Sequence, residues 1–403
     1  MSAPQTLSAN EAIGTIFLSP EGLEDPVPYY HRLRDIAPVH DTGTGTIFLT
    51  RFDDCREALR DNRLGKSGAA GSLLPTSNPE VIRIRQEQLD RAREAKQAVS
   101  MLFLNPPHHT RQRSLVSRAF TPRRVEGLRA SIRDVADRLV DDFVEQGGGD
   151  LLDAIAFPLP VAVIGTMVGV PASDWPQFRQ LITTSAGALE PSATPEELIA
   201  AEAASAEVRR YFAALVAERR NQPQDDLLSD LIRVEEAGDT LSEGEVIAVA
   251  ILLFAAGFET TTNLIGNGMG ALLRHPDQMD RLWRDGALLP TAVEEMLRWD
   301  SPVQLDARTA LESTSVAGQE IEASTRIVTL LGAANRDPEQ FEDPDRFDVA
   351  RDDGPPMSFA SGIHYCLGAN LSRAEAQEVF AALRSRCATI ELDGELVLSL
   401  IHI

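Results

Sequence analysis

The sequence has few cysteines, and they form no pattern. Cys55, Cys366 and Cys387 are the only three in 403 residues, and no two of them are closely spaced. An odd, sparse set excludes a disulfide framework and a zinc-type cluster, and it favours a reducing cytoplasm. Aromatic residues make up only 5% of the chain. The tryptophans form no cluster, so we expect no stacking platform for single-stranded nucleic acid.

Positive charge is also scarce. Asp and Glu number 61 against 38 Lys and Arg, which gives a formal net charge of −23. Such a surface repels phosphate, so we exclude nucleic acids and anionic membranes as general partners. Residues 1–14 lack the cationic start and the apolar run of a signal peptide. Pro158, Pro160 and Pro171 interrupt the charge-free run 154–173, which we interpret as a buried helix in a soluble, cytoplasmic protein.

Helical patterns dominate the chain, and β patterns are confined to small regions. Strands are predicted at 46–50 and within 305–331, where Ala317-Gly318 has the composition of a hairpin turn. The segment 335–356 is rich in Asp and Pro and is predicted to be irregular. Helices are predicted at residues 24–37, 109–121, 123–146, 158–170, 172–187, 194–221, 225–236, 291–299 and from Cys366 to about Arg386. The predicted fold class is mainly α with a small β region, in a single domain.

One predicted helix is much longer than the others. Ser242 and Glu245 form a capping box, and the helical pattern continues to His275, just before Pro276. At ~1.5 Å per residue this helix is roughly 50 Å long. Its middle, Val246–Phe258, is apolar on every side, which predicts burial through the centre of the molecule. We therefore expect the domain to be built around this long central helix.

A cysteine lies on a glycine-containing loop just before the last helix, in the segment FASGIHYCLGA of residues 359–369. A helix N-terminus and its free N–H groups favour a thiolate over a thiol, so the surroundings of Cys366 favour its thiolate form. Gly362 and Gly368 permit tight turns and the close approach of a large planar group. The other two cysteines have no such context and are interpreted as small buried hydrophobic residues.

This segment resembles the haem-binding loop of the cytochrome P450 family, which has the pattern F-x-x-G-x-H-x-C-x-G. The family usually has glycine directly after the phenylalanine, where this chain has Ala360; alanine is a tolerable replacement unless the position needs a positive φ. The resemblance implies the cytochrome P450 fold and a haem b cofactor, with Cys366 as the iron ligand. It also implies that Phe359 packs beside the sulfur and that His364 contacts a haem propionate. It extends over nearly the whole chain, from about residue 26 to residue 395.

The long helix carries a second segment of the family. AGFETT, which begins at Ala256, resembles the oxygen-binding sequence A-G-x-[DE]-T-[TS], and the small Ala256 leaves room for a flat macrocycle. A carboxylate such as Glu259 is costly in an apolar helix, which argues for a function. The resemblance makes Glu259 and Thr260 catalytic: Thr260 would hold O2 and a water by hydrogen bonds, and Glu259 would supply protons from solvent. Thr261 and Thr262 have the alternative of bonding back to the preceding helical turn.

The helix after the long one contains Glu295-Met-Leu-Arg298, which places opposite charges on one face. The segment Pro344-Asp-Arg346-Phe follows it and resembles the P-x-R-F segment of the family. The resemblance implies a structural triad of Glu295, Arg298 and Arg346 beneath the haem.

Further upstream, NPPHHTRQR, beginning at Asn105, resembles the helix start D-P-P-x-H-T-x-x-R of the family, with Asn in place of Asp. His109 and Arg113 would lie on one face of this helix. The resemblance makes them contacts of the haem propionates, together with Arg308.

The substrate would lie above the iron, in a roomy apolar pocket suited to a small apolar molecule. The residues expected to line this pocket are Leu252, Ala255, Val303 and Leu305. By the same resemblance, the stretch 64–101 would cover the pocket. Its arginines have two interpretations: contact with an anionic or carrier-bound substrate, or the simpler one of a solvated helix face. These arginines are Arg83, Arg85, Arg91 and Arg93.

Electrons must come from a partner, because the sequence contains no flavin or iron–sulfur segment. Residues 101–125 contain Arg111, Arg113, Arg118, Arg123 and Arg124 but no Asp or Glu. Against the net charge of −23, this basic patch predicts a docking face for an acidic ferredoxin, which a ferredoxin reductase would reduce. Pairing with local acids is an equally good interpretation for Arg118, Arg123 and Arg124.

The expected function is a haem-thiolate monooxygenase that inserts one oxygen atom of O2 into a small apolar substrate, by hydroxylation or epoxidation, in secondary metabolism. Two alternatives stay open: a non-catalytic scaffold, which would be expected to lack the cysteine, and a peroxide-driven variant, which would be expected to replace the acid–threonine pair. The expected domain covers residues 26–397, after an N-terminal segment of residues 1–25. Residues 398–403 do not resemble the tail of the family, which predicts a truncated end. The substrate, its regiochemistry and the oligomeric state stay open.

Overall fold

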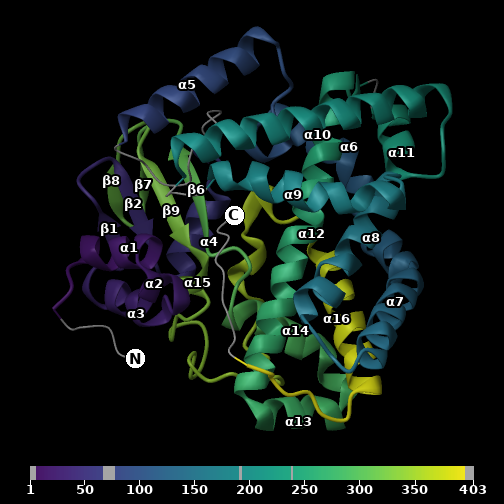
Figure 1. The fold of residues 1–403 in the computed structure, drawn as a ribbon. Helices are drawn as coiled ribbons and strands as arrows, with labels where there is room; N and C mark the ends of the chain where they lie inside the picture. The colour runs from purple at the N-terminus through teal and green to yellow at the C-terminus, as the bar shows by residue number, and fades with distance from the viewer. Residues whose placement is uncertain (1–5, 67–77, 190–192, 237–238, 395–403) are drawn as a thin grey trace.

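A computed structural model describes residues 6–66, 78–189, 193–236 and 239–394. Figure 1 shows a large helical part around one long helix and a smaller part that contains most of the β-strands. The predicted fold class, mainly α with a small β region, is confirmed. The predicted atypical end, residues 398–403, lies outside the described residues.

The α-helices of the described residues account for most of the chain. They are α1 (Ala9–Leu18), α2 (Pro20–Glu24), α3 (Val27–Ile36), α4 (Phe52–Arg60), α5 (Pro79–Glu94), α6 (His108–Ser117), α7 (Pro122–Glu145), α8 (Pro158–Val168), α9 (Trp175–Ala186), α10 (Pro195–Asn221), α11 (Leu227–Arg233), α12 (Glu243–Arg274), α13 (Pro276–Arg284), α14 (Leu289–Trp299), α15 (Leu331–Ala334) and α16 (Ala369–Arg386).

Most of the predicted helices are confirmed, and four differ at one end by three or four residues. The helix predicted at 109–121 ends at Ser117, and the one predicted at 172–187 begins at Trp175. The helix predicted at 24–37 begins only at Val27, because Pro26 occupies its N-cap position. The helix predicted at 225–236 ends at Arg233, where the chain enters a short hairpin. The N-terminal segment, for which no element was predicted before residue 24, forms α1 and α2, and α1 packs against α3.

Helix α12 passes through the middle of the helical part and contacts α8, α10, α14 and α16 (Figure 1). The predicted capping box is confirmed, since the Ser242 hydroxyl accepts from the Glu245 N–H and the Glu245 carboxylate accepts from the Ser242 N–H. The helix is long and apolar enough to cross a membrane, but 56% of its most apolar window is buried inside the protein. Burial to this extent is expected of a helix that forms the core of a protein.

The predicted strands supply three strands of a five-stranded sheet and one hairpin; the sheet strands at 39–41 and 64–65 and a second hairpin were not predicted. The sheet has the order β1-β2-β9-β6-β3, in which only the β2–β9 pair is parallel. Between β7 and β8, Ala317 and Gly318 have φ values of 47° and 77°, which confirms the predicted turn. The strands are β1 (Val39–Asp41), β2 (Thr46–Leu49), β3 (Leu64–Gly65), β4 (Glu235–Glu236), β5 (Asp239–Thr240), β6 (Leu305–Ala310), β7 (Thr314–Val316), β8 (Gln319–Ile321) and β9 (Arg326–Leu330).

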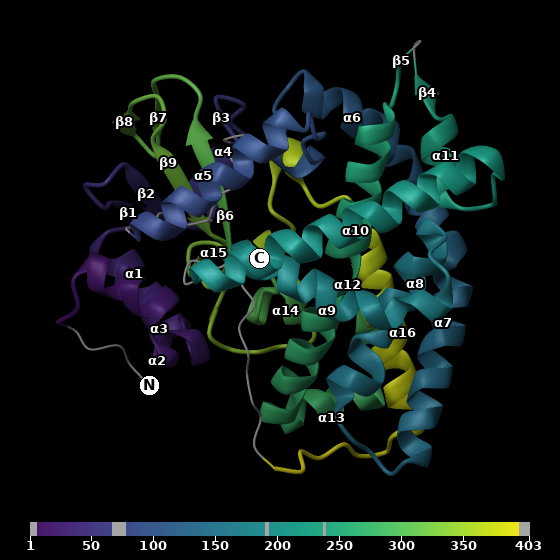
Figure 2. The ribbon, with the colours of Figure 1, turned by 45° about the horizontal axis from the view of Figure 1, so that its top comes forward.

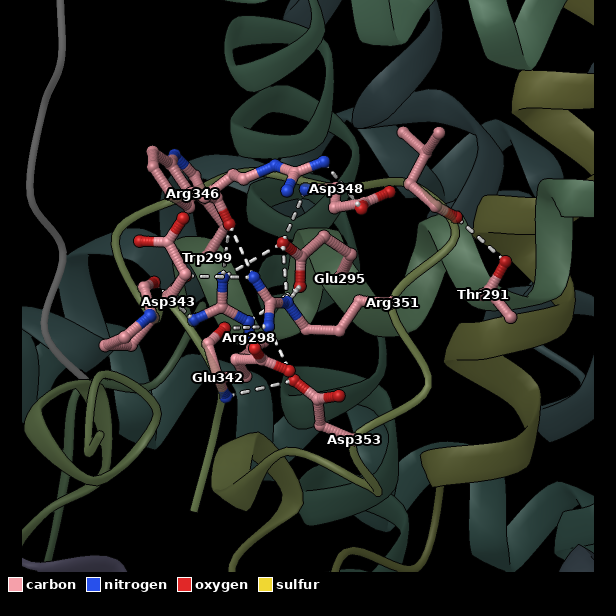
Figure 3. A network of polar contacts seen from close by, with 12 residues as sticks. Thr291, Glu295, Arg298, Trp299, Glu342, Asp343, Arg346, Asp348, Arg351 and Asp353 are labelled. Atoms are coloured by element: carbon pink, nitrogen blue, oxygen red, sulfur yellow. Dashed lines mark hydrogen bonds and ion pairs between the residues drawn. The ribbon is translucent and has the colours of Figure 1, made fainter. Parts of the chain in front are cut away.

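A buried ion pair on α14 holds the irregular segment 335–356 in place (Figure 3). Arg298 donates to both carboxylate oxygens of Glu295, at 2.6 and 2.9 Å, and both side chains are almost fully buried. The remaining donors of Arg298 bind main-chain carbonyls, at 2.9 Å to Asn335, 2.8 Å to Pro344 and 3.3 Å to Arg346. The guanidinium thus clamps the backbone of the segment against the helix.

The predicted triad is corrected at its third member. The Arg346 side chain is 60% exposed and contacts Asp348, because the turn from Asp343 directs its carbonyl inward and its side chain outward. Arg351 takes its place: its Nε lies 3.1 Å from Glu295 Oε2, and its other nitrogens donate to the carbonyls of Glu342, Asp343 and Arg346 (Figure 3).

This arrangement predicts unequal effects of two arginine substitutions. Arg351→Ala removes a nearly buried cation from Glu295, so it should lower the free energy of unfolding by about 3 kcal/mol. Arg346→Ala breaks only an exposed ion pair, so it should change the free energy of unfolding by less than about 0.5 kcal/mol. Denaturant unfolding of the two variants measures both values. If Arg346→Ala lowers the free energy of unfolding as much as Arg351→Ala or more, Arg346 is the third member of the triad after all.

Candidate active site

The cysteine loop is fastened to the core from two sides. Asn335 accepts from the N–H of Met357 (2.7 Å) and donates to the Ser358 hydroxyl (2.9 Å). Ser358 in turn donates to the carbonyl of Leu297 on α14 (2.7 Å). On the other side, Gly362 lies against α4, where a Cβ would come within 2.2 Å of a carbonyl oxygen. The loop therefore has little freedom to move.

Cys366 lies between this loop and the start of α16. Its N–H donates to the carbonyl of Phe359 at 3.1 Å, which brings the two predicted residues together. Burial among protein atoms raises the pKa of the thiol, although the N–H of Gly368 and the charge of Arg113 lower it. The groups predicted to favour a thiolate are thus present, and burial opposes them.

Solvent nevertheless reaches Cys366, which is exposed, and the same is true of Ala256 in the middle of α12. Helix α12 and the first turns of α16 lie together here, because the Thr261 hydroxyl donates to Ser372 at 3.1 Å. A Cβ added at Gly368 would meet no described atom within 4 Å. Ala256 and Cys366 are thus accessible, and Gly368 has open space on its Cβ side; we call the region of these three residues the hollow. Burial of the whole helix centre, as predicted from its apolar sequence, is therefore wrong on this side.

The predicted propionate contacts gather in one cluster beside the hollow. The rings of His109 and His364 have centroids 4.1 Å apart, and Arg113 donates to the carbonyl of Tyr365 at 2.5 Å. Burial and nearby arginines lower the pKa of His109 to about 4 and that of His364 to about 3. Both imidazoles are therefore neutral at pH 7. Arg308 is buried and pairs with Asp306.

Several polar atoms of this cluster are buried without a hydrogen-bond partner among the described residues: both ring nitrogens of His109, Nε2 of His364 and Nη2 of Arg308. Orphaned buried polar groups are rare in proteins, since each costs ~1–3 kcal/mol. Two carboxylates would accept from Arg308 and from the one N–H of each neutral imidazole, and the open space at Gly368 leaves room for a planar ring. The residues present therefore fit a haem with its propionates at this cluster and Cys366 at its iron.

The sequence reasoning missed two members of the cluster. Lys66, on the chain after β3, lies 2.5 Å from Asp306, and its positive charge helps to hold the pKa of that buried carboxyl down to about 2, although burial raises it. Asp306 thus pairs with both Lys66 and Arg308 in this cluster. A pairing between residues so far apart in the chain has no signal in one sequence.

The predicted catalytic pair lies on α12 at the hollow. The Thr260 hydroxyl donates to the carbonyl of Ala256 at 3.1 Å, and Glu259 is buried with 7% of its surface exposed. The alternative stated for Thr262 is confirmed, because its hydroxyl donates to the carbonyl of Phe258 at 2.9 Å. Thr261 instead reaches α16, as described above.

A second buried acid, close to Thr261, was not predicted. Glu375 on α16 is 1% exposed, and burial raises its pKa to about 8, although the Thr261 hydroxyl lowers it. The carboxyl is therefore mainly protonated at neutral pH.

Of the four predicted pocket residues, Leu252, Ala255 and Val303 are partly accessible, and their place in a substrate pocket stays a prediction. Leu305 is corrected: it is 2% exposed and packs with Tyr30 and other residues between the sheet and α3. Its place in β6 sets this direction, because alternate residues of a strand point to opposite faces.

The fold and this site define a class of protein: a mainly helical protein with a cysteine loop and a donor cluster shaped for haem. The chain matches the cytochrome P450 family model over residues 196–390. It is 39% identical over 384 residues to the cytochrome P450 monooxygenase PikC of Streptomyces venezuelae, covering 93% of this chain and 87% of that protein. It is 38% identical over 377 residues to the putative cytochrome P450 133B2 of Xylella fastidiosa, covering 93% and 92%.

Solved structures agree with these matches. The ligand-free structure of CYP164A2 from Mycobacterium smegmatis has a TM-score of 0.84 and 36% identity, covering 96% of this chain and 95% of that one. The chain belongs to the cytochrome P450 family. The predicted enzyme class, a monooxygenase among the oxidoreductases, is confirmed, and the family binds haem.

Ala360 yields a prediction, because its backbone has φ 57° and ψ −153°, a region that only glycine enters easily. The condition under which alanine would be poorly tolerated is therefore met. Ala360→Gly should raise the free energy of unfolding by about 1 kcal/mol, the relieved strain exceeding the entropy of the added glycine. Ala374→Gly, in the helical backbone of α16, should lower it. Denaturant unfolding of both variants tests this, and a loss of stability in Ala360→Gly would contradict it.

Proposed function

We propose that the protein binds haem b through Cys366 and inserts one oxygen atom of O2 into a small apolar organic molecule, by hydroxylation or epoxidation. The observation that carries the proposal is the cluster of orphaned donors beside an accessible cysteine. His109, Arg113, Arg308 and His364 would hold the propionates. Haem, once bound through a thiolate, supplies the activation of oxygen.

Residues of α12 would leave room for O2 and deliver protons above the haem. Thr260 uses its hydroxyl hydrogen on the carbonyl of Ala256, so its oxygen is left as an acceptor for a water. Glu259, one residue before it, would pass protons from solvent toward that water. The small side chain of Ala256 leaves this part of the hollow open for O2.

Electrons would come from a ferredoxin and its reductase, with the ferredoxin docking on the cysteine side of the haem. The exposed Arg123 supports this part of the proposal. The basic patch is smaller than predicted, because Arg111 pairs with Glu245 and Arg124 with Asp230. Arg113 belongs to the propionate cluster.

The two alternatives are less well supported. A non-catalytic scaffold has no use for an accessible Cys366 or for a row of orphaned donors. A peroxide-driven variant would dispense with the pair Glu259 and Thr260, which this chain retains. A cytoplasmic location would follow from the soluble, acidic character of the chain.

The first experiment tests the ligand. The reduced, CO-bound protein is expected to show the strongly red-shifted Soret band of thiolate ligation, and Cys366→Ala should lose it. Cys387→Ala is the matched control and should keep the band. A wild-type spectrum without the shift, or a shift that survives in Cys366→Ala, would overturn the proposal.

The second experiment tests the proton relay. Thr260→Ala should lower the product formed per electron pair severalfold and release peroxide instead, because the water that delivers protons loses its partner. Thr262→Ala, whose hydroxyl binds only backbone carbonyls, should keep the coupling of the parent. Coupling is measured as product against reductant consumed, and unchanged coupling in Thr260→Ala counts against the relay.

A further inference from the structure

Lysine is almost absent from this chain, and one of its two lysines is nearly buried. The sequence contains Lys66 and Lys96, while arginine supplies the other basic side chains that carry a permanent charge. Lys96 is exposed, whereas the side chain of Lys66 is only 11% exposed and lies 2.5 Å from Asp306. A buried ammonium group is costly unless it is paired and hydrogen-bonded. Lys66 is therefore not a residue that merely keeps the surface soluble.

The backbone of Lys66 is held in place by the sheet and by one side chain. Strand β3, which ends just before Lys66, is an edge strand paired with β6, and in Figure 2 it lies on the side of the sheet toward α6. Asn105, shortly before α6, accepts from the N–H of Lys66 at 2.7 Å and donates to its carbonyl at 2.7 Å. Aspartate, which the family pattern has at this position, could not donate the second bond. Asn105 thus fixes the backbone from which the lysine extends.

The ammonium group shares the carboxylate of Asp306 with Arg308. Lys66 Nζ and Arg308 Nη1 both donate to Asp306 Oδ1, and both also donate to the carbonyl of Ala307. Arg308 therefore binds Asp306 through only one of its two amino groups. Its buried Nη2 is left without a hydrogen-bond partner among the described residues. This second amino group is the one that a propionate could use.

Asp306 and Lys66 support each other's charge. Burial raises the pKa of Asp306, but the charges of Lys66 and Arg308 bring it down to about 2, so the carboxyl is ionised at pH 7. Burial lowers the pKa of Lys66, and the charge of Asp306 raises it. Each charge of the pair thus stabilises the other in a place with little water.

Asp306 is an anion in a cluster that would also have to receive the two propionates of a haem. Besides the neutral histidines, the loaded cluster would contain three carboxylates. Among the described residues three cations would face them: Lys66, Arg113 and Arg308. Without Lys66, one carboxylate would lack a counter-charge, and Asp306 would compete with a propionate for Arg308. An uncompensated charge is costly where few waters can screen it.

We propose that Lys66 retains the haem by neutralising Asp306, which leaves Nη2 of Arg308 available to a propionate. This inference rests on the proposed function and adds a positioning residue to it, because Lys66 acts on the cofactor through Asp306. Its charge also favours the reduced, more negative state of the haem iron.

The test measures how fast the haem-loaded protein loses hemin to an excess of apomyoglobin, followed by Soret absorbance. Lys66→Met removes the charge and keeps most of the length of the side chain, so hemin loss should become about tenfold faster or more. The double variant Lys66→Met with Asp306→Asn removes both charges, and its rate should lie within about twofold of the parent rate. A purely structural role of the lysine predicts no such rescue.

The reduction potential of the haem iron is the second measurement. Lys66→Met should make it more negative, because the added electron meets an uncompensated carboxylate, and the double variant should return it toward the parent value. Lys96→Met is the matched control, since it removes the other, exposed lysine, and it should change neither quantity. Unchanged hemin loss in Lys66→Met, or a double variant that loses hemin as fast as Lys66→Met, would overturn the inference.

Failure of the proposed function gives a different result. Hemin transfer is followed at the Soret band whichever residue binds the iron. If the CO-bound protein lacks the red-shifted band, but hemin loss still depends on Lys66 and is rescued by Asp306→Asn, the thiolate proposal fails and the role of Lys66 stands. If the band is present and Lys66→Met loses hemin at the parent rate, only the role of Lys66 fails.

Discussion

The buried ion pair of Glu295 and Arg298 holds the rest of the site in position. Removing both charges from water is costly, and the pair stands because every nitrogen of the guanidinium finds an acceptor. One of these acceptors is the carbonyl of Asn335, whose side chain fastens Met357 and Ser358 at the start of the cysteine loop. Arg298 on α14 is thereby linked to the loop that carries Cys366, through Asn335 and the loop residues that Asn335 binds.

The donor cluster beside the hollow is a local exception in an acidic protein. The chain has a net charge of −23, yet His109, Arg113, Arg308 and His364 meet in one buried place. The histidines stay neutral because burial and the arginines disfavour their protonation. Neutral imidazoles can still donate one hydrogen bond each, so they add donors for a negatively charged group without adding to the positive charge of Arg113 and Arg308.

Much of the fold could be predicted because its signals are local. The capping box and the apolar run set the limits of α12, and the glycine-containing loop marked Cys366. Directions of side chains were harder to predict: a motif gives the residue type at position 346, but the turn at Asp343 decides that Arg351 contacts Glu295. Leu305 shows the same difficulty, since the pairing of β6 decides which face it joins.

Distant pairings account for most of what was missed. Some pairs come together only after the chain has folded, and no spacing in the sequence predicts them. Examples are Lys66 with Asp306 and Glu375 with Thr261. Arg85 and Arg83 look alike in the sequence, and only the packing of α5 against α10 distinguishes their surroundings.

Arg298 and Arg351 contact carbonyl oxygens of the irregular segment, and carbonyls are common to every amino acid. The clamp is therefore indifferent to most side-chain identities between Glu342 and Arg346, yet sensitive to how many residues the segment contains. Relatives of this chain are free to diverge in the composition of the segment, while an insertion or deletion there would shift the carbonyls out of register with the guanidinium groups.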